Sequence, residues 1–218
     1  MIKACIFDLD GTLCNTLDSI AYFCNKTLDQ LGYTNIPTKE YRNLVGHGAE
    51  QLIHNMLHIV HPTYTPEDVC TAKQIFMDFY KEDPLKCAKL YEDILPLLQT
   101  LKAKGMLLAI LTNKPHSLAE LSIPKLFGEH LFDVWYGQRD EIPRKPAPDG
   151  ALMIANELSV KPNQCLFIGD SDVDMHTGNN AGMQTAGVLW GYRSEKELLN
   201  AGAQMIASAP WDIQNFVI

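Results

Sequence analysis

The sequence predicts an α/β protein in which a parallel sheet is covered by helices on both faces and an all-helical segment follows the first strand. A short apolar run at residues 2–7 is followed at once by acidic residues. Residues 16–83 then carry apolar side chains at helical spacing. From residue 90 onwards, short apolar runs alternate with helical stretches. This alternation is typical of a parallel sheet that is buried on both faces.

The inserted segment is predicted to contain at least three helices. Apolar side chains mark one face of residues 17–31, and Gly32 is suited to end that helix. The same spacing recurs over residues 49–60. Thr65 and Pro66 predict the start of a third helix, because threonine caps helix N-termini and proline fits the first turn.

The later strands are predicted from apolar runs, at residues 107–111, 132–136, 165–168 and 185–190. Helices are predicted between them, for example at residues 94–104 and 151–158. We therefore divide the chain into an α/β core of residues 1–15 and 86–218 and a helical unit of residues 16–85.

Composition limits the classes of partner and location. The net charge of the 218 residues is −8, and no basic stripe is present to neutralise a nucleic-acid backbone. No apolar stretch approaches the length of a membrane span or a signal peptide. The six cysteines are scattered without a Cys-x-x-Cys pair, which favours free thiols. We expect a cytoplasmic protein, monomeric or homodimeric, with no nucleic-acid or membrane partner.

The acidic pair after the first strand is the clearest sign of chemistry. Asp8 and Asp10 are two residues apart, so both side chains can crowd one point at the carboxyl end of the strand. Two carboxylates held so close persist only if a cation neutralises them or one carries a proton. Both conditions suit an acid that attacks phosphorus beside a bound Mg²⁺ ion.

Polar clusters also follow other predicted strands. Thr112, Asn113 and Lys114 follow one strand, and the segment 169–174 follows another. A further cluster at residues 144–149 precedes a predicted helix. Ligands of an open parallel sheet bind beyond the carboxyl ends of its strands. Convergence of these clusters would assemble carboxylates, a hydroxyl and an ammonium, which are the groups that metal-dependent phosphoryl transfer needs.

These clusters resemble, in order, the four motifs of the haloacid dehalogenase superfamily: Asp8-x-Asp10-Gly11-Thr12, Thr112, Lys145 and Gly169-Asp170-x-x-x-Asp174. The resemblance implies a Rossmann-like core, with the helical unit as a cap that opens and closes. It also implies Mg²⁺-dependent hydrolysis of a small phosphorylated metabolite. The acid at position 10 favours phosphate esters over carbon–halogen bonds.

The resemblance also implies catalytic and metal-binding roles for four aspartates. Asp8 would be the nucleophile that becomes a phosphoaspartate. Asp10 would protonate the leaving oxygen and then deprotonate the attacking water. The Mg²⁺ ion would be held by the carboxylate of Asp8, the backbone carbonyl of Asp10 and Asp170, with Asp174 in support.

The same resemblance implies the groups that hold the phosphate. The hydroxyl of Thr112 and the backbone of Asn113 would bind phosphate oxygens, and Gly11 is grouped with these substrate-binding residues. Lys145 would offset the charge of the nucleophile and the phosphate.

A loop in the helical unit indicates the substrate. The segment 44–49 resembles its counterpart in phosphoglycolate phosphatases, which makes phosphoglycolate the leading candidate. His47 in this loop is predicted to contact the substrate when the cap closes. The alternative is that Gly46-His47-Gly48 is only a flexible turn.

Three other functions are compatible with these residues. A phosphosugar mutase of the β-phosphoglucomutase type would use the same acids. A phosphonate hydrolase would need a cap lysine that forms a Schiff base, for which Lys26 and Lys39 are available. A phospho-accepting receiver or binding module would use Asp8 as a switch. Asp172 is interpreted as a cap of the following helix and is left out of the site.

Overall fold

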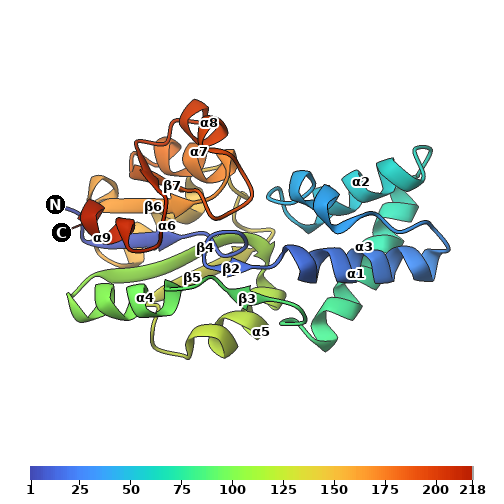
Figure 1. The fold of residues 1–218 in the computed structure, drawn as a ribbon, viewed down its shortest axis with the longest axis horizontal. Coiled ribbons are helices and arrows are strands. Elements are labelled where there is room, and N and C mark those ends of the chain that lie inside the picture. Colours follow the sequence, from blue (N-terminus) through green and yellow to red (C-terminus); the bar gives the residue numbers. More distant parts are fainter. Residues whose placement is uncertain (218) are drawn as a thin grey trace.

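A computed structural model describes residues 1–217, and in it six parallel strands form one sheet in the order β5-β4-β1-β6-β7-β8 (Figure 1). The strands are β1 Ala4–Phe7, β4 Leu107–Pro115, β5 Val134–Gln138, β6 Cys165–Gly169, β7 Gln184–Val188 and β8 Met205–Ala207. The predicted parallel sheet is confirmed.

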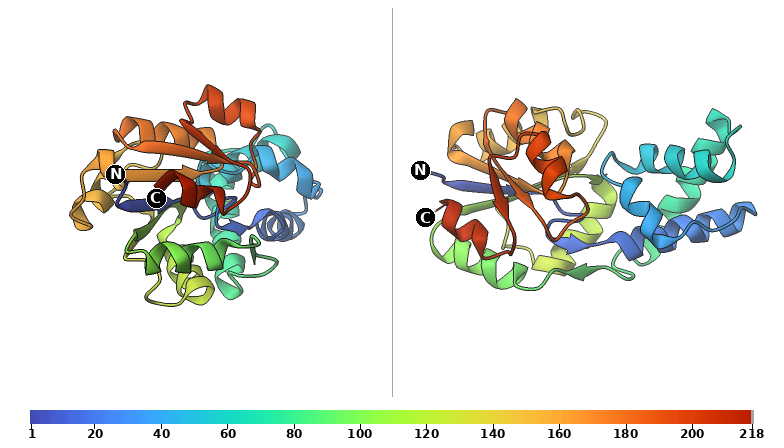
Figure 2. Two further views of the ribbon diagram at one scale, coloured as in Figure 1. Left: turned by 60° about the vertical axis from the view of Figure 1, so that its left-hand side comes forward. Right: turned by 45° about the horizontal axis from the view of Figure 1, so that its top comes forward.

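Helices cover both faces of this sheet (Figure 2). Cys5 and Phe7 of β1 pack in the same hydrophobic cluster as α4, α5 and α9, whereas Ala4 and Ile6 point to the opposite face and pack with α6. This division follows from the two-residue period of a strand. The helices of the core are α4 Ile94–Ala103, α5 His116–Phe127, α6 Asp149–Glu157, η2 Pro162–Gln164, α7 Asp172–Asn180, α8 Glu195–Asn200 and α9 Asp212–Val217.

The helical unit stands beside the sheet and has a hydrophobic cluster of its own, which includes Leu28, Ile53 and Phe76 (Figure 1). Its helices are α1 Leu17–Leu31, η1 Thr38–Asn43, α2 Ala49–Val60 and α3 Pro66–Glu82. Gly32 ends α1 with a left-handed φ of 77°, as predicted. No helix among residues 1–217 is both long and apolar enough to span a membrane.

The two connections between the core and the helical unit lie side by side. The entering segment β2 Cys14–Asn15 pairs antiparallel with the returning segment β3 Lys89–Leu90. The amide of Tyr91 also donates to the carbonyl of Leu13 over 3.2 Å. The helical unit is therefore attached to the core through a short two-stranded ribbon.

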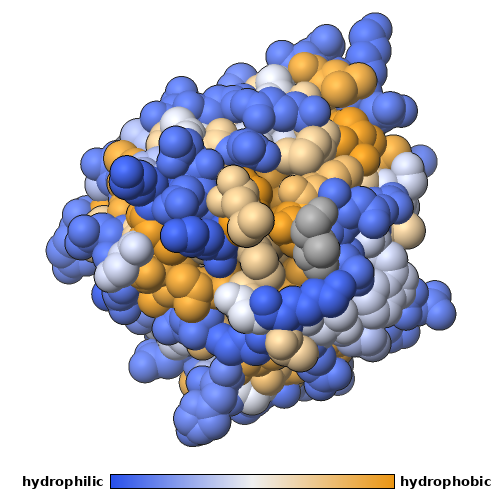
Figure 3. Space-filling view, turned by 90° about the vertical axis from the view of Figure 1, so that its left-hand side faces the viewer, coloured by the Kyte–Doolittle hydropathy of each residue, from blue (hydrophilic) through white to orange (hydrophobic). Residues whose placement is uncertain are grey.

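The order of the strands determines where the site forms. From the central β1, the chain continues outward through β4 and β5 and then returns to the other side of β1 with β6. In open parallel sheets, ligands bind at such a reversal, beyond the carboxyl ends of the strands. The helical unit lies at this end (Figure 1), whereas the opposite end shows hydrophilic residues around scattered hydrophobic ones (Figure 3).

The predicted start of α3 can be tested by substitution. Thr65 caps this helix by accepting from the amide of Asp68 at 3.3 Å, while the Asp68 carboxylate accepts from the amide of Thr65 at 2.7 Å. Thr65→Ala should lower the free energy of unfolding by about 1 kcal/mol, because the amide of Asp68 loses its side-chain acceptor. The measurement is urea unfolding followed by circular dichroism. Thr71→Ala, at an exposed position inside the same helix, is the control and should change stability far less.

Candidate active site

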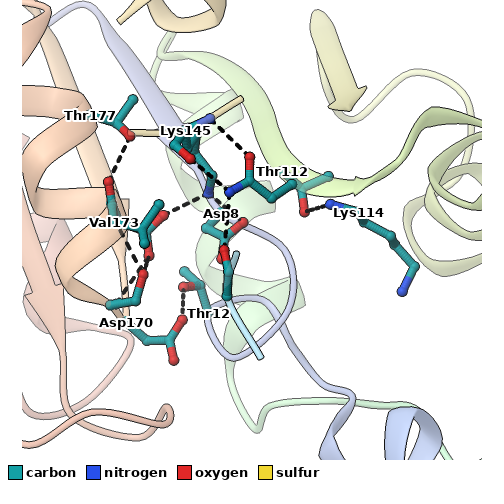
Figure 4. A network of polar contacts seen from close by, with 12 residues as sticks. Asp8, Thr12, Thr112, Lys114, Lys145, Asp170, Val173 and Thr177 are labelled. Atoms are coloured by element: carbon teal, nitrogen blue, oxygen red, sulfur yellow. Dashed lines mark hydrogen bonds and ion pairs between the residues drawn. The ribbon is translucent and has the colours of Figure 1, made fainter. Parts of the chain in front are cut away.

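Three carboxylates meet beyond the carboxyl ends of β1 and β6 (Figure 4). Asp8 directly follows β1, Asp170 directly follows β6, and Asp174 lies in the first turn of α7. One carboxylate oxygen of each lies within 4.8 Å of those of the other two, and all three residues are buried. Buried acids this close repel one another strongly unless positive charge is added between them.

Lys145 supplies part of that charge. Its ammonium donates to Asp8 Oδ1 over 2.8 Å and to Asp174 Oδ1 over 2.6 Å, and only 3% of its side chain is exposed. The loop that precedes α6 thus places a cation between residues that are far apart in sequence. Burial by itself lowers the pKa of Lys145, but Asp174 and Asp8 raise it above its ordinary value, so the side chain stays charged.

β4 continues to Pro115, beyond the predicted end of this strand at residue 111, so Thr112 and Asn113 lie in its last part. Their side chains are arranged differently. Thr112 Oγ1 accepts from the amide of Lys114 over 3.1 Å, so its own hydroxyl proton remains available to a ligand. The Asn113 side chain instead braces two loops. It accepts from the amide of Lys145 over 2.9 Å and donates to the carbonyls of Lys145 and Gly46 at 3.1 and 3.0 Å.

Asp170 is oriented by groups from two other segments. Thr12 donates its hydroxyl to Asp170 Oδ1 over 3.2 Å, and the amide of Tyr192 donates to Oδ2 over 2.7 Å. Gly11 lies against this carboxylate with φ of 93°, and a Cβ there would be 2.4 Å from Asp170 Oδ2. Gly11 thus permits a close approach to Asp170, and it is not among the residues that line the pocket described below.

A pocket lies over the carboxylates, between the core and the helical unit. It encloses about 560 Å³, with the solvent at its mouth included. Asp8, Asp10, Thr112, Lys114 and Lys145 line it from the core, together with apolar residues from the helical unit. The Asp10 side chain is 19% exposed and accepts from the ammonium of Lys114 over 3.3 Å.

Comparison with known proteins identifies the family. A family profile described as haloacid dehalogenase-like hydrolase matches residues 5–188. The chain belongs to this family. The match spans all four of the motifs recognised in the sequence.

Individual relatives agree with this assignment over nearly the whole chain. This haloacid dehalogenase-like hydrolase is 32% identical over 191 residues to the phosphoglycolate phosphatase of Aquifex aeolicus, which covers 88% of this chain and 86% of that protein. A solved structure of a predicted phosphoglycolate phosphatase from Haemophilus somnus aligns with a TM-score of 0.92 and 27% identity, covering 100% and 98% of the two chains.

A third relative comes from the same family. The structure of a haloacid dehalogenase-like hydrolase from Streptococcus pneumoniae aligns with a TM-score of 0.88 and 28% identity, covering 100% of this chain and 99% of that one. The predicted family, fold and enzyme class, a haloacid dehalogenase-type phosphatase, are thereby confirmed.

The loop expected to contact the substrate is arranged differently from the prediction. Gly46 and Gly48 line the pocket over Asp8, but His47 does not. His47 lines a separate surface hollow shared with His176, and its carbonyl accepts from Arg144 over 3.3 Å. In this arrangement, the backbone on either side of His47 faces the pocket in place of its ring.

The interpretation of Asp172 as a helix cap is wrong. Ser171 is the N-cap residue of α7, with its hydroxyl accepting from the amide of Asp174 over 3.4 Å, and Asp172 is the first residue inside the helix. The Asp172 carboxylate is partly exposed and lies 4.0 Å from Arg193. Ser171 caps the helix because its hydroxyl oxygen reaches the amide of Asp174, the third residue of the helix. In return, the carboxylate of Asp174 accepts from the amide of Ser171.

Burial and mutual repulsion set the protonation of the two central acids. Burial raises the pKa of Asp8, and Asp174 and Asp170 raise it further, against the lowering effect of Lys145. Burial and Asp174 raise the pKa of Asp170 to about 7, although the amide of Tyr192 and the hydroxyl of Thr12 oppose the shift. These shifts belong to the protein without a metal ion, and a bound cation would lower both pKa values because it stabilises the ionised carboxylates.

The donor set fits a divalent cation. The cluster of Asp8, Asp170 and Asp174 offers only carboxylate oxygens, the ligands that hard cations such as Mg²⁺ prefer. With Asp10 included, four carboxylates face two ammonium groups, those of Lys114 and Lys145. The negative charge left over when all six groups are ionised is what a divalent ion neutralises.

Three side chains that shape the pocket were not identified from sequence as part of the site. Lys114 belongs to the recognised cluster Thr112-Asn113-Lys114, but nothing in the sequence showed that its ammonium turns to the helical unit. Tyr80 of α3 and Tyr192 beyond β7 carry no motif. Both line the pocket, and only the folded chain brings them there.

The raised pKa of Asp170 predicts a pH-dependent response to metal. In the unfolded chain this acid ionises near its ordinary pKa, whereas the metal-free folded protein holds the proton up to about pH 7. Raising the pH from about 5.5 to about 8 should therefore lower the stability of the metal-free enzyme by about 2 kcal/mol. Added divalent cation should restore more stability at the higher pH, because it binds the ionised carboxylates.

The measurement is thermal unfolding at both pH values, with and without the cation. Asp170→Asn removes one of the two acids with a raised pKa and should reduce both the pH dependence and the response to metal. A wild-type enzyme that gains equal stability from the cation at both pH values would contradict the assignment of Asp170.

Proposed function

We propose that this enzyme is a cytoplasmic, Mg²⁺-dependent phosphatase that hydrolyses a small phosphate monoester, with phosphoglycolate the leading candidate, through a phosphoaspartate on Asp8. One observation carries the proposal. Asp8 lines the pocket, paired with Lys145 and within 4.8 Å of the carboxylates of Asp170 and Asp174. The names of relatives such as the phosphoglycolate phosphatase of Aquifex aeolicus support the choice of substrate. The six free cysteines support the location.

The metal would be held close to the nucleophile. Asp8 and Asp170 would contribute carboxylate oxygens, and Asp10 would contribute its backbone carbonyl. Both oxygens of Asp174 already accept from Lys145 and Ser171, which suits a supporting position better than a direct bond. When bound, Mg²⁺ supplies positive charge that lets the anionic phosphate approach the anionic nucleophile.

The first step transfers the phosphoryl group to Asp8. A carboxylate oxygen of Asp8 attacks phosphorus, a new P–O bond forms, and the bond from phosphorus to the ester oxygen breaks. Asp10 gives its proton to the departing oxygen, so that an alcohol leaves in place of an alkoxide. Asp10 is placed for this role because its side chain lines the pocket two residues from the nucleophile.

The second step returns Asp8 to its carboxylate form. Asp10, now ionised, takes a proton from a water molecule, and the oxygen of that water attacks the phosphorus of the phosphoaspartate. The bond between phosphorus and Asp8 breaks, and inorganic phosphate is released. Asp10 ends the cycle protonated and Asp8 ends it ionised, as both began.

Two buried groups would hold the phosphate during transfer. The hydroxyl of Thr112 has a free proton to donate, and the ammonium of Lys145 already touches the nucleophile. Fixed donors aimed at the equatorial oxygens lower the barrier because charge spreads onto those oxygens in the transition state.

We propose that residues 16–85 act as a cap over this chemistry. The cap loop meets the core through backbone carbonyls: that of Gly46 accepts from Asn113, and that of Val45 accepts from Arg193 over 3.2 Å. Closing the pocket in this way excludes bulk water, which strengthens the electrostatic interactions between the site and the phosphate. A Schiff base from a cap lysine has no support, because neither Lys26 nor Lys39 lines the pocket.

The nucleophile assignment predicts the effect of a single substitution. Asp8→Asn should abolish release of phosphate, by at least about four orders of magnitude, because the amide cannot form the phosphoaspartate. The measurement is phosphate release from phosphoglycolate, alongside circular dichroism to confirm the fold. Asp140→Asn changes an exposed acid and should leave turnover unaltered. Near-normal activity of Asp8→Asn would overturn the mechanism.

The metal assignment predicts the effect of exchange and chelation. Removing divalent ions with a chelator should stop turnover, and Mg²⁺ should restore it. Ca²⁺ should bind yet inhibit, because its larger and looser coordination misplaces the nucleophile. The measurement is phosphate release after dialysis and re-addition of each ion. Full activity in the chelated enzyme would be incompatible with the proposed site.

A further inference from the structure

The pocket over Asp8 has a second cationic group besides Lys145. Lys114 lines the same pocket, and only 5% of its side chain is exposed. Among the described residues that line the pocket, these two lysines are the only cations. Lys145 donates to Asp8 and Asp174 at the nucleophile, whereas Lys114 extends away from Asp8 (Figure 4).

Lys114 is held in place by one group from the cap and one from the core. Its ammonium donates to the hydroxyl of Tyr80 over 2.7 Å and to Asp10 Oδ1 over a longer 3.3 Å. It also lies 4.4 Å from the centre of the Tyr80 ring. An ammonium has three protons, and the described residues supply hydrogen-bond acceptors for two of them. One proton of a buried cation therefore remains for a ligand in the pocket.

Lys114 keeps its charge despite its burial. Burial alone would lower the pKa of Lys114, but the carboxylate of Asp10 and the hydroxyl of Tyr80 raise it above its ordinary value. A buried ammonium with an unpaired proton lowers the stability of the folded protein, and a methionine or leucine could fill the same space without that cost. Its presence therefore indicates a role in binding.

Most of the pocket wall that the cap and α5 contribute is apolar. Its residues from the cap and from α5 include Ile20, Val45, Leu52, Phe76 and Leu118. A sugar phosphate would place several hydroxyl groups against this wall, where they would lose their hydrogen bonds to water without finding new ones. The wall therefore disfavours the phosphosugar mutase alternative and suits a short carbon skeleton.

The geometry points to a carboxylate subsite: we propose that Lys114, positioned by Tyr80, binds a carboxylate group of the substrate, so that the enzyme selects phosphate monoesters of small hydroxy acids. This inference rests on the proposed phosphatase function and deepens it. It names the residue that distinguishes such a substrate from a neutral phosphate ester of the same size.

The position of Lys114 also limits the length of the substrate. Asp10 serves the ester oxygen that leaves, and Lys114 touches Asp10. A group that binds Lys114 must therefore lie within a few bonds of that oxygen. An α-hydroxy acid esterified on its hydroxyl meets this condition, because one carbon separates the ester oxygen from the carboxylate.

The test compares two substrates with the same enzyme sample. Phosphoglycolate carries the carboxylate, and ethyl phosphate has the same two-carbon skeleton with a methyl group in its place. In the wild type, kcat/KM should favour phosphoglycolate. Lys114→Met should reduce the ratio of the two kcat/KM values by about a hundredfold, because a buried charged hydrogen bond is lost only for the carboxylate. Tyr80→Phe should reduce the ratio by about three- to tenfold, because the ammonium loses its orienting partner.

The ratio is independent of the fraction of enzyme that is folded or active, so a general structural defect does not change it. Lys26→Met, a cap lysine outside the pocket, is the control and should leave the ratio unchanged. If Lys114→Met hydrolyses neither ester, the same comparison is made by calorimetric binding of both esters in the Asp8→Asn background. There, Lys114→Met should weaken binding of phosphoglycolate selectively.

Two outcomes separate this inference from the proposed function. A wild-type enzyme without preference for phosphoglycolate, or a Lys114→Met variant with an unchanged ratio, would overturn the carboxylate subsite and leave the phosphatase intact. A wild-type enzyme that releases phosphate from no ester would instead overturn the proposed function itself.

Discussion

The buried ammonium of Lys145 is the interaction on which the site depends. It contacts Asp8 at the end of β1 and Asp174 in the first turn of α7, and it is itself placed by the loop before α6. Without this cation, three buried acids within 4.8 Å would face one another with no protein charge between them. Removing one partner of a buried ion pair costs far more than an exposed pair is worth. The repulsion among these carboxylates therefore fixes the relative positions of three segments that are distant in sequence: the end of β1, the start of α7 and the loop before α6.

The contacts that support the carboxylates also hold the cap. Asn113 binds both main-chain groups of Lys145 and, with the same side chain, the carbonyl of Gly46 in the cap loop. On the other side, Arg42 of the cap donates to the carbonyl of Gly191, next to the residue whose amide donates to Asp170. The position of the cap and the orientation of two carboxylates thus share supporting residues. A cap that lifts away would loosen the site as well as expose it to water.

The sequence predicted the parts of this structure that depend on local pattern. Asp8, Thr112 and Asp170 could be placed at strand ends because the preceding apolar runs are unmistakable, and α2 has the predicted bounds Ala49–Val60. The short edge strand β8 was missed, because its three residues do not form a long enough apolar run.

Contacts between distant segments could not be predicted in the same way. Lys114 and Tyr80 are separated by 34 positions, and the direction of a lysine side chain after a strand depends on what packs beside it. The same limit applies to His47, which lines a surface hollow apart from the pocket over Asp8. It also explains why Ser171, and not Asp172, caps α7. Ser171 and Asp172 are adjacent, and either side chain could cap a helix. Which of them lies at the N-cap depends on where the helix begins, and that is fixed by how the helix packs.

The two buried lysines give the pocket a direction that the acids alone would not. Lys145 pairs with Asp8, at the end of the pocket where phosphate would bind, and Lys114 lies at the end toward the cap. Asp10, which would protonate the ester oxygen between the phosphate and the rest of the substrate, pairs with Lys114. A substrate with one anionic group can satisfy only one of these cations. A substrate with two, separated by a short carbon link, can satisfy both and leave no buried donor without a partner. Specificity of this kind comes mainly from the penalty on the wrong substrate, because the unmet ammonium proton costs free energy whenever a neutral group displaces water from it.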